Sequence, residues 1–177
     1  PQQRIAILRE AVDSAAALLR LAPNWANAWH AHGAALVRYS QHLSVVKALS
    51  QGLGSKVRES LHRALQLEPG HAAAHVALGV YNAEVIDKVG AVVGGLTYGV
   101  RREAVVDHFE AARALHPQSA LVLAEYAYAS LLVLDGARSG RSDALCAEAA
   151  ACQPADALER LHLEWALGEI EAGTGYP

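Results

Sequence analysis

Residues 56–85 read KVRESLHRALQLEPGHAAAHVALGVYNAEV, and two helical patterns meet in this stretch. Its first half carries apolar residues at helical spacing and stops two residues before Pro69. Its second half resumes a helical pattern soon after Gly70. Because proline is tolerated in the first turn of a helix but not in its interior, Pro69 separates two helices. The stretch therefore predicts two helices joined by a short turn.

The same pattern recurs along the chain. Pro23, Pro69, Pro117 and Pro154 each close an apolar helical run, and a new run follows each within a few residues. These prolines are 46, 48 and 37 residues apart. Alanine, the best helix former, is abundant. No alternation of apolar and polar residues is long enough for a strand. The sequence therefore predicts an all-α protein.

We expect one domain over residues 1–177, built as an α-α superhelix of about eight antiparallel helices. A chain of this length is one ordinary domain and buries roughly 70% of its unfolded surface. The helices are expected at residues 5–21, 24–49, 55–67, 72–93, 101–115, 120–135, 142–152 and 155–172. They are expected to form four hairpin units, at residues 1–49, 55–93, 101–135 and 142–172.

Equivalent positions, counted from each proline, carry residues of the same kind. Ten residues after the first two prolines stand Gly33 and Gly79. Eight residues before the second and third prolines stand Leu61 and Phe109. Small residues at such positions let the two helices of a hairpin touch, and large residues fill the space beside them. The spacing therefore predicts the same helix contact in successive copies.

This register resembles the tetratricopeptide repeat superfamily, whose unit is a helix–turn–helix of about 34 residues. The resemblance covers nearly all of the chain in degenerate copies: Leu18 replaces an expected alanine, and Glu164 replaces an expected small residue. Residues 56–85 with REAVVDHFEAARALHPQS (102–119) look like the regulator of microtubule dynamics family and its bacterial relatives. The segments VGGLTYG (93–99), HFEAARAL (108–115) and LHLEWAL (161–167) are similar to the periplasmic T-component of TRAP-type transporters. Neither resemblance brings a catalytic motif to these positions.

A glycine-rich segment follows the helix that begins at residue 72. We expect this helix to overrun, to break near Gly94 and Gly95, and to restart near Arg101. A membrane span is disfavoured, because the apolar run from Val89 to Val100 is far shorter than the ~20 residues required. A phosphate loop is disfavoured as well, because neither GxGxxG nor GxxxxGK[ST] is present.

Two histidines, His71 and His75, stand four residues apart, as two metal ligands on one helix face would. The HExxH glutamate is missing, and the sequence identifies no third ligand. His75 also occupies the position, six residues after a proline, that Trp29 fills in the first copy. The preferred interpretation is a packing or capping role, with zinc as the rival. No metal, cofactor or catalytic residue is predicted, and a Ser nucleophile elbow of GxSxG type is absent.

The leading hypothesis is a non-enzymatic scaffold that binds a segment of a partner protein in a concave groove. In solenoids of helical hairpins, the first helix of each hairpin lines that concave face. The alternative hypothesis is a periplasmic binder of a small hydrophobic ligand, as the likeness to the TRAP T-component implies. The predicted groove residues are Asn27, His30, Arg38, Val80, Glu84, Glu125, Tyr128, Leu161 and Trp165.

Charge and cysteine content limit the partners and the compartment. The net charge is −3, with 15 basic and 18 acidic residues, so no nucleic-acid partner is expected. Cys146 and Cys152, six residues apart on one helix, are separated by about 9 Å, too far for a disulfide. Free thiols favour the cytoplasm. The chain begins with Pro1, which suggests a trimmed fragment, so a lost leader and a periplasmic location stay open, as does a homo-oligomer.

Overall fold

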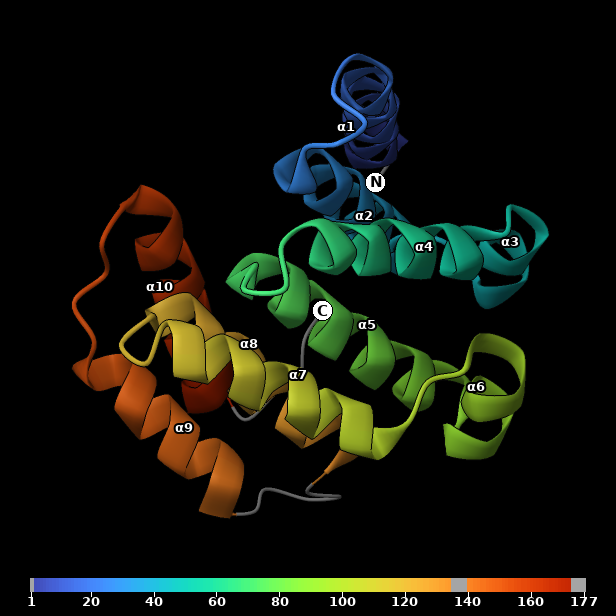
Figure 1. Cartoon of the computed structure of the whole chain (residues 1–177). Helices are drawn as coiled ribbons and strands as arrows, with labels where there is room; N and C mark the ends of the chain where they lie inside the picture. Colours follow the sequence, from blue (N-terminus) through green and yellow to red (C-terminus); the bar gives the residue numbers. More distant parts are fainter. Residues whose placement is uncertain (1, 135–139, 173–177) are drawn as a thin grey trace. The chain divides into compact units, whose positions relative to one another are not determined.

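The computed structural model describes residues 2–134 and 140–172, except for the side chains of residues 2, 162, 165, 166 and 169–172 (Figure 1). In these residues, ten α-helices and no strand are present, so the all-α prediction is confirmed. The helices are α1 (Gln2–Leu21), α2 (Ala26–Gln41), α3 (Val45–Ser50), α4 (Leu53–Leu67), α5 (Ala72–Val89), α6 (Ala91–Tyr98), α7 (Arg102–Leu115), α8 (Ala120–Val133), α9 (Gly140–Ala151) and α10 (Ala157–Ala172).

The chain forms two compact units, residues 1–78 and 79–177, whose boundary falls inside α5. The single domain, the four hairpin units and the superhelical arrangement stay predictions. In the first unit, α2 packs against both α1 and α4, and α3 packs against α4. Val57 and Leu61 are fully buried on α4, and Leu36 is buried on α2. The core of this unit therefore lies along α2 and α4.

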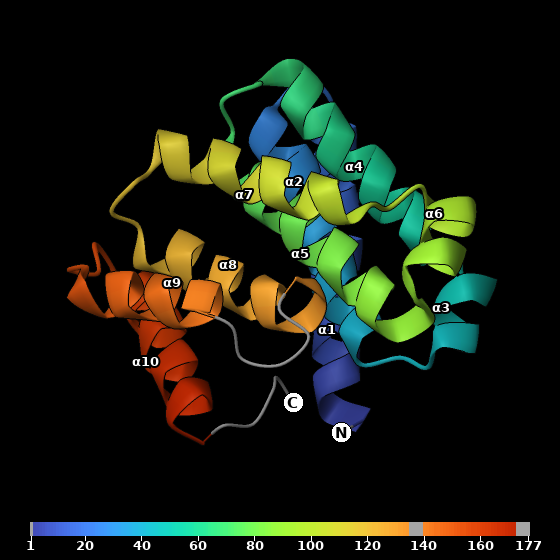
Figure 2. The same ribbon diagram turned by 90° about the horizontal axis from the view of Figure 1, so that it is seen from below.

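In the second unit, α8 packs against α7, α9 and α10 (Figures 1 and 2). The sequence of α8 is apolar nearly all round, ALVLAEYAYASLLV, as is typical of a helix with neighbours on several sides. Its Leu123 and Tyr126 are buried, as are Val105 and Phe109 of α7. The core of this unit therefore surrounds α8.

A close helix contact at the glycine register occurs in both units. A Cβ atom added to Gly33 would lie 2.6 Å from a methyl carbon of Leu61, and one added to Gly79 would lie 2.5 Å from the Phe109 ring. Real Cβ atoms do not approach other atoms so closely. Glycine therefore allows α2 to lie against α4, and α5 against α7, at the same position of successive copies.

The residue two positions after each of the four prolines directly precedes a helix, so it is the N-cap of that helix. Three of these residues accept a hydrogen bond from the backbone N–H of the third helical residue. His71 Nδ1 accepts from Ala74, Ser119 Oγ from Val122, and Asp156 Oδ1 from Glu159. The fourth, Trp25, makes no such bond. The prolines thus set where the helices begin.

The predicted single helix over residues 24–49 is wrong, because it is interrupted after Gln41. His42 adopts φ −96° and ψ 8°, and the Ser44 side chain then accepts a hydrogen bond from the Lys47 N–H to start α3. Serine is a strong N-cap residue. The extra residues of this copy therefore form a separate short helix instead of a longer α2.

The predicted break near Gly94 and Gly95 is also wrong, since both residues lie inside α6. The chain breaks instead at Gly90 (φ 82°) and Gly99 (φ 67°), where a positive φ favours glycine. A Cβ atom on Gly94 would lie 2.8 Å from Val100 Cγ2 and 3.4 Å from Val85 Cγ1. Gly94 therefore serves close packing of α6, which lies beside the end of α5 (Figure 2).

The remaining helix boundaries differ from the predictions by a few residues. The first helix begins at Gln2 instead of residue 5, α9 begins at Gly140, and α10 begins at Ala157. The predicted end of the sixth helix at residue 135 lies outside the described residues. Cys146 and Cys152 are free cysteines, as their spacing predicts.

Candidate functional site

Three of the predicted groove residues lie on α2, in the first unit. Asn27 and His30 are brought together by His71: the Asn27 side chain lies 2.8 Å from the His71 ring, and the His30 ring lies 4.9 Å from it, centroid to centroid. Arg38 is half-buried in the last turn of α2. Asn27 and His30 therefore belong to one polar cluster, in which His71 is the central residue.

The other predicted groove residues lie in the second unit. Val80, Glu84 and Glu125 are buried, with the Glu84 carboxylate 3.7 Å from the Lys88 ammonium. Tyr128 is half-buried, and Leu161 is exposed. The Trp165 side chain lies outside the described residues. Among the described side chains of the predicted groove, Leu161 is the large apolar one that is exposed to solvent. The groove as a whole stays a prediction.

The hydrogen bonds of His71 fix the proton on its ring. Because the Ala74 N–H is the donor, Nδ1 must accept and carries no proton. Nε2 then carries the proton and donates to Asn27 Oδ1 at 2.8 Å. His71 is buried, so both ring nitrogens are satisfied within the protein. The predicted capping role of this histidine is confirmed.

His30 lies beside this ring and is half-buried. Partial burial, and then the neighbouring His71, lower the pKa of His30 from 6.5 to about 4. Burial also lowers the pKa of His32, whose Nδ1 lies 2.8 Å from Ser60 Oγ on α4. The partly buried surroundings of His30 and His32 on α2 therefore favour the uncharged form of the imidazole.

A second polar contact repeats six residues after a proline. Trp29 Nε1 donates to the carbonyl oxygen of Pro23 at 2.7 Å, and His75 Nε2 donates to that of Pro69 at 3.1 Å. A carbonyl can only accept, so His75 carries its proton on Nε2. The equivalence of Trp29 and His75 is confirmed. Leu123, the third member of this series, has no donor and is buried.

Trp29→Phe is expected to lower the free energy of unfolding by about 1 kcal/mol, because the ring is kept while one hydrogen bond is lost. Urea denaturation of the purified chain measures this difference. Trp25→Phe is the matched control, since Trp25 is exposed and makes no capping bond. Equal effects of the two substitutions would mean that the Pro23 contact contributes nothing.

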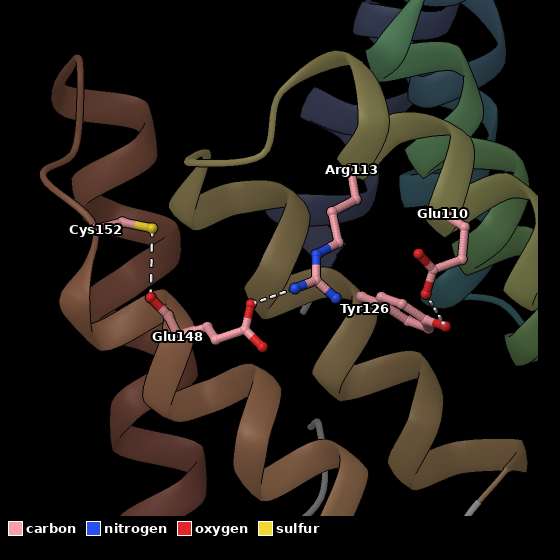
Figure 3. A network of polar contacts seen from close by, with 5 residues as sticks. All are labelled: Glu110, Arg113, Tyr126, Glu148 and Cys152. Carbon is pink, nitrogen blue, oxygen red and sulfur yellow. Dashed lines mark hydrogen bonds and ion pairs between the residues drawn. The ribbon is translucent and has the colours of Figure 1, made fainter.

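Three helices of the second unit meet at the hydroxyl of Tyr126. Tyr126 Oη donates to Glu110 Oε1 at 3.1 Å and accepts from Arg141 Nη1 at 3.0 Å. Burial, and then the Glu110 carboxylate, raise the pKa of Tyr126, while Arg141 opposes the increase. Figure 3 shows Glu110 on α7 facing Tyr126 on α8. The phenol is therefore held as a neutral link between α7, α8 and α9.

Arg113 of α7 and Glu148 of α9 form an ion pair at 2.6 Å (Figure 3). Both side chains are more than a third exposed, so the pair contributes only about 0–1 kcal/mol. Cys152 Sγ donates to the backbone carbonyl of Glu148, and burial, followed by Glu159 and Glu148, raises the pKa of the thiol. A raised pKa leaves less thiolate, so Cys152 is a poor nucleophile.

Glu159 connects the starts of α8 and α10. Its Oε1 accepts from the Ser119 hydroxyl at 2.5 Å, and its Oε2 accepts from the Ala155 N–H at 2.9 Å. Its own N–H donates to Asp156 Oδ1, and Ser119 caps α8. The carboxylate therefore joins two helix caps, which is a structural role.

Large apolar side chains face solvent on the short helix α6. Val92, Val93 and Leu96 fall within about 100° of the helix circumference at 100° per residue. They are 76%, 51% and 86% exposed, whereas Gly94 is buried against Val85 and Val100. We call these three residues the α6 face. The helix thus turns its small residue inward and its large aliphatic residues outward.

Similar exposure occurs on α3 and α10. Val46 is 76% exposed on α3, and Leu158 and Leu161 are more than half exposed on α10, three residues apart. Isolated exposed aliphatic residues are common on protein surfaces, but contiguous ones often mark interaction sites. The α6 face is the most exposed of these groups and is our candidate functional site.

No match was found for the chain. This holds for protein-family models, for curated proteins and for solved structures. The likeness to tetratricopeptide repeat proteins therefore stays a prediction. Across residues 2–134 and 140–172, no group of three or more His, Cys, Asp or Glu residues is placed to hold a metal ion. None of the helices described is both long and apolar enough to cross a membrane.

The α6 face and the Asn27–His71 bond were not predicted from the sequence. The α6 face could have been found from Gly90 and Gly99, which lie at either end of an apolar segment of helical length. The Asn27–His71 bond joins residues 44 positions apart. Its only sequence signal is that His71 occupies the position of the capping residues Ser119 and Asp156.

Proposed function

We propose that the chain is a non-enzymatic interaction module that binds a segment of a partner protein. The observation that carries the proposal is the α6 face, where three adjacent aliphatic side chains lie in solvent on one side of a helix. Burying apolar surface is favourable by about 25 cal/mol per Å², so a partner that covers this face gains binding energy there. Leu161 and Leu158 on α10 give the second unit a further apolar contact of the same kind.

The polar groups support this reading because they hold helices together. His71, Tyr126 and Glu159 each satisfy their hydrogen bonds with groups from neighbouring helices or helix caps. Burial raises the pKa of Cys152, which suppresses its reactivity. These side chains therefore stabilise the packing of the helices.

Photo-crosslinking tests the proposal directly. A photoreactive phenylalanine at Leu96 is expected to give a discrete cross-linked product with a partner protein in an extract of the source cells. The same residue at Ala91, which is exposed on another side of α6, is the matched control. Cross-linking at both positions alike, or at neither, would count against the α6 face as a binding site.

Val92→Asp is expected to abolish that product while changing the free energy of unfolding by no more than about 0.5 kcal/mol, because Val92 is exposed. Cross-linking yield and urea denaturation measure the two quantities. A product that survives Val92→Asp would contradict the proposal. A small apolar molecule that copurifies with the chain, seen by native mass spectrometry, would favour the alternative ligand-binding function.

A further inference from the structure

His71 is an unusual residue for its position. Its counterparts two residues after the later prolines are Ser119 and Asp156, and both cap their helices with an oxygen atom. Serine and aspartate are among the preferred N-cap residues. Serine keeps its acceptor at any pH, whereas an imidazole nitrogen accepts only while it is unprotonated. The α5 cap thus depends on the protonation state of its side chain.

Both nitrogens of His71 are committed to particular partners. Nδ1 accepts from the Ala74 N–H at 3.2 Å, and Nε2 donates to Asn27 Oδ1 at 2.8 Å. A proton added to Nδ1 would point at the Ala74 N–H, so two donors would face each other. The positive end of the α5 dipole lies at the same place and opposes an added positive charge. The arrangement therefore requires an uncharged ring.

His30 extends this requirement across to α2. Its ring is tilted by 40° against the His71 ring at a centroid distance of 4.9 Å, so a charge on one ring disfavours a charge on the other. Partial burial and His71 lower the pKa of His30 to about 4. A proton therefore binds His30 in the folded chain about 300-fold more weakly than an unperturbed histidine.

Charged groups on α4 act on His32, another histidine of α2 whose pKa is lowered. Lys56 and Glu59, on α4, influence the pKa of His32. Of the described charged groups, His71 is the one that acts on His30. The backbone carbonyl of Glu68 accepts a hydrogen bond from the backbone N–H of His71. The Glu68 side chain is exposed to solvent. The charge balance of the cluster thus rests on the two imidazoles.

We propose that Asn27, His30 and His71 form an acid-sensitive latch, which fixes the first turn of α5 to α2 while both imidazoles are uncharged. Acidification protonates His30 beside the His71 ring and releases that turn. Because the pKa of His30 is lower in the folded chain than in the unfolded one, the latch is fully stabilising above about pH 6.5. Its contribution is lost as the pH falls from 6.5 toward 4. The latch is a separate property from partner binding.

Nitrogen-15 NMR of the wild-type chain tests the latch. At pH 7.5, His71 is expected to carry its proton on Nε2 alone. Between pH 6.5 and 4, the hydrogen-exchange protection of the Ala74 amide is expected to fall as His30 titrates. His42→Gln, which removes an exposed histidine of the same unit, is expected to leave both results unchanged.

The double variant His30→Phe/His71→Ser contains neither imidazole and carries the cap residue of the third copy. Its Ala74 protection is expected to fall less between pH 6.5 and 4 than that of the wild type, because the lowered pKa values of His32 and His62 act in both chains. A loss of protection equal to that of the wild type would overturn the proposal. If the double variant does not fold, the wild-type tautomer decides alone, because a proton on His71 Nδ1 at pH 7.5 would also overturn it.

Discussion

Phe109→Ala is expected to lower the free energy of unfolding by about 3–5 kcal/mol, the range for removing a buried aromatic side chain. Phe109 is fully buried, its ring stacks on Tyr126 at 4.8 Å and 4°, and it lies against Gly79. Its loss leaves a cavity where α5 and α7 meet and removes the ring on which Tyr126 lies. The decrease in the free energy of unfolding therefore includes the transfer free energy of the buried ring and the cost of the cavity.

Urea denaturation measures the Phe109→Ala effect, and hydrogen exchange locates it. We expect protection to fall chiefly within residues 79–177. Leu115→Ala on the same helix is the control, since Leu115 is exposed and its truncation should cost less than about 1 kcal/mol. An effect of Phe109→Ala no larger than that of the control would be incompatible with the described core.

Leu61→Ala is expected to cost about 2–5 kcal/mol, because a fully buried leucine leaves a cavity that its neighbours fill only in part. Its side chain lies directly against Gly33, so the loss falls at the contact between α2 and α4. The same denaturation experiment measures it, with protection falling within residues 1–78. Leu21→Ala is the matched control, because Leu21 is 84% exposed. Similar costs for both would show that Leu61 is not in a core.

The helices and their repeated contacts were predictable because they depend on local signals. Proline restricts the backbone wherever it occurs, so Pro23 and Pro69 mark the turns. A glycine and a large residue at fixed distances from the prolines predict a close helix contact, as Gly79 and Phe109 show. The positions of the turns are independent of how distant parts of the chain meet.

The glycine-rich segment was predicted incorrectly because glycine has two roles. Gly90 and Gly99 adopt a positive φ and break the helix, whereas Gly94 lies inside a helix and makes room for Val100. Composition alone does not separate a residue that needs conformational freedom from one that needs a missing side chain. The distinction depends on the neighbours that α6 meets after the chain turns back.

The candidate site, the α6 face, was not predicted, and the residues of the predicted groove differ in their exposure. Leu161 was expected on a working surface and is exposed, while Glu84 and Glu125 from the same prediction are buried. Exposure depends on tertiary packing, which the repeat register does not determine. Asn27 and His30 were predicted to face a partner, whereas the structure places them around His71.

Glycine and a large side chain make the same close contact in two successive helix pairs, and Gly79→Ala places a methyl group in one of these contacts. In the wild-type background the added methyl group meets the Phe109 ring, and we expect a loss of about 1–3 kcal/mol in the free energy of unfolding. In the Phe109→Ala background that obstacle is absent. There the better helix propensity of alanine is expected to make the same substitution stabilising, by up to about 1 kcal/mol. An equal effect of Gly79→Ala in both backgrounds would show that Phe109 does not pack closely against Gly79.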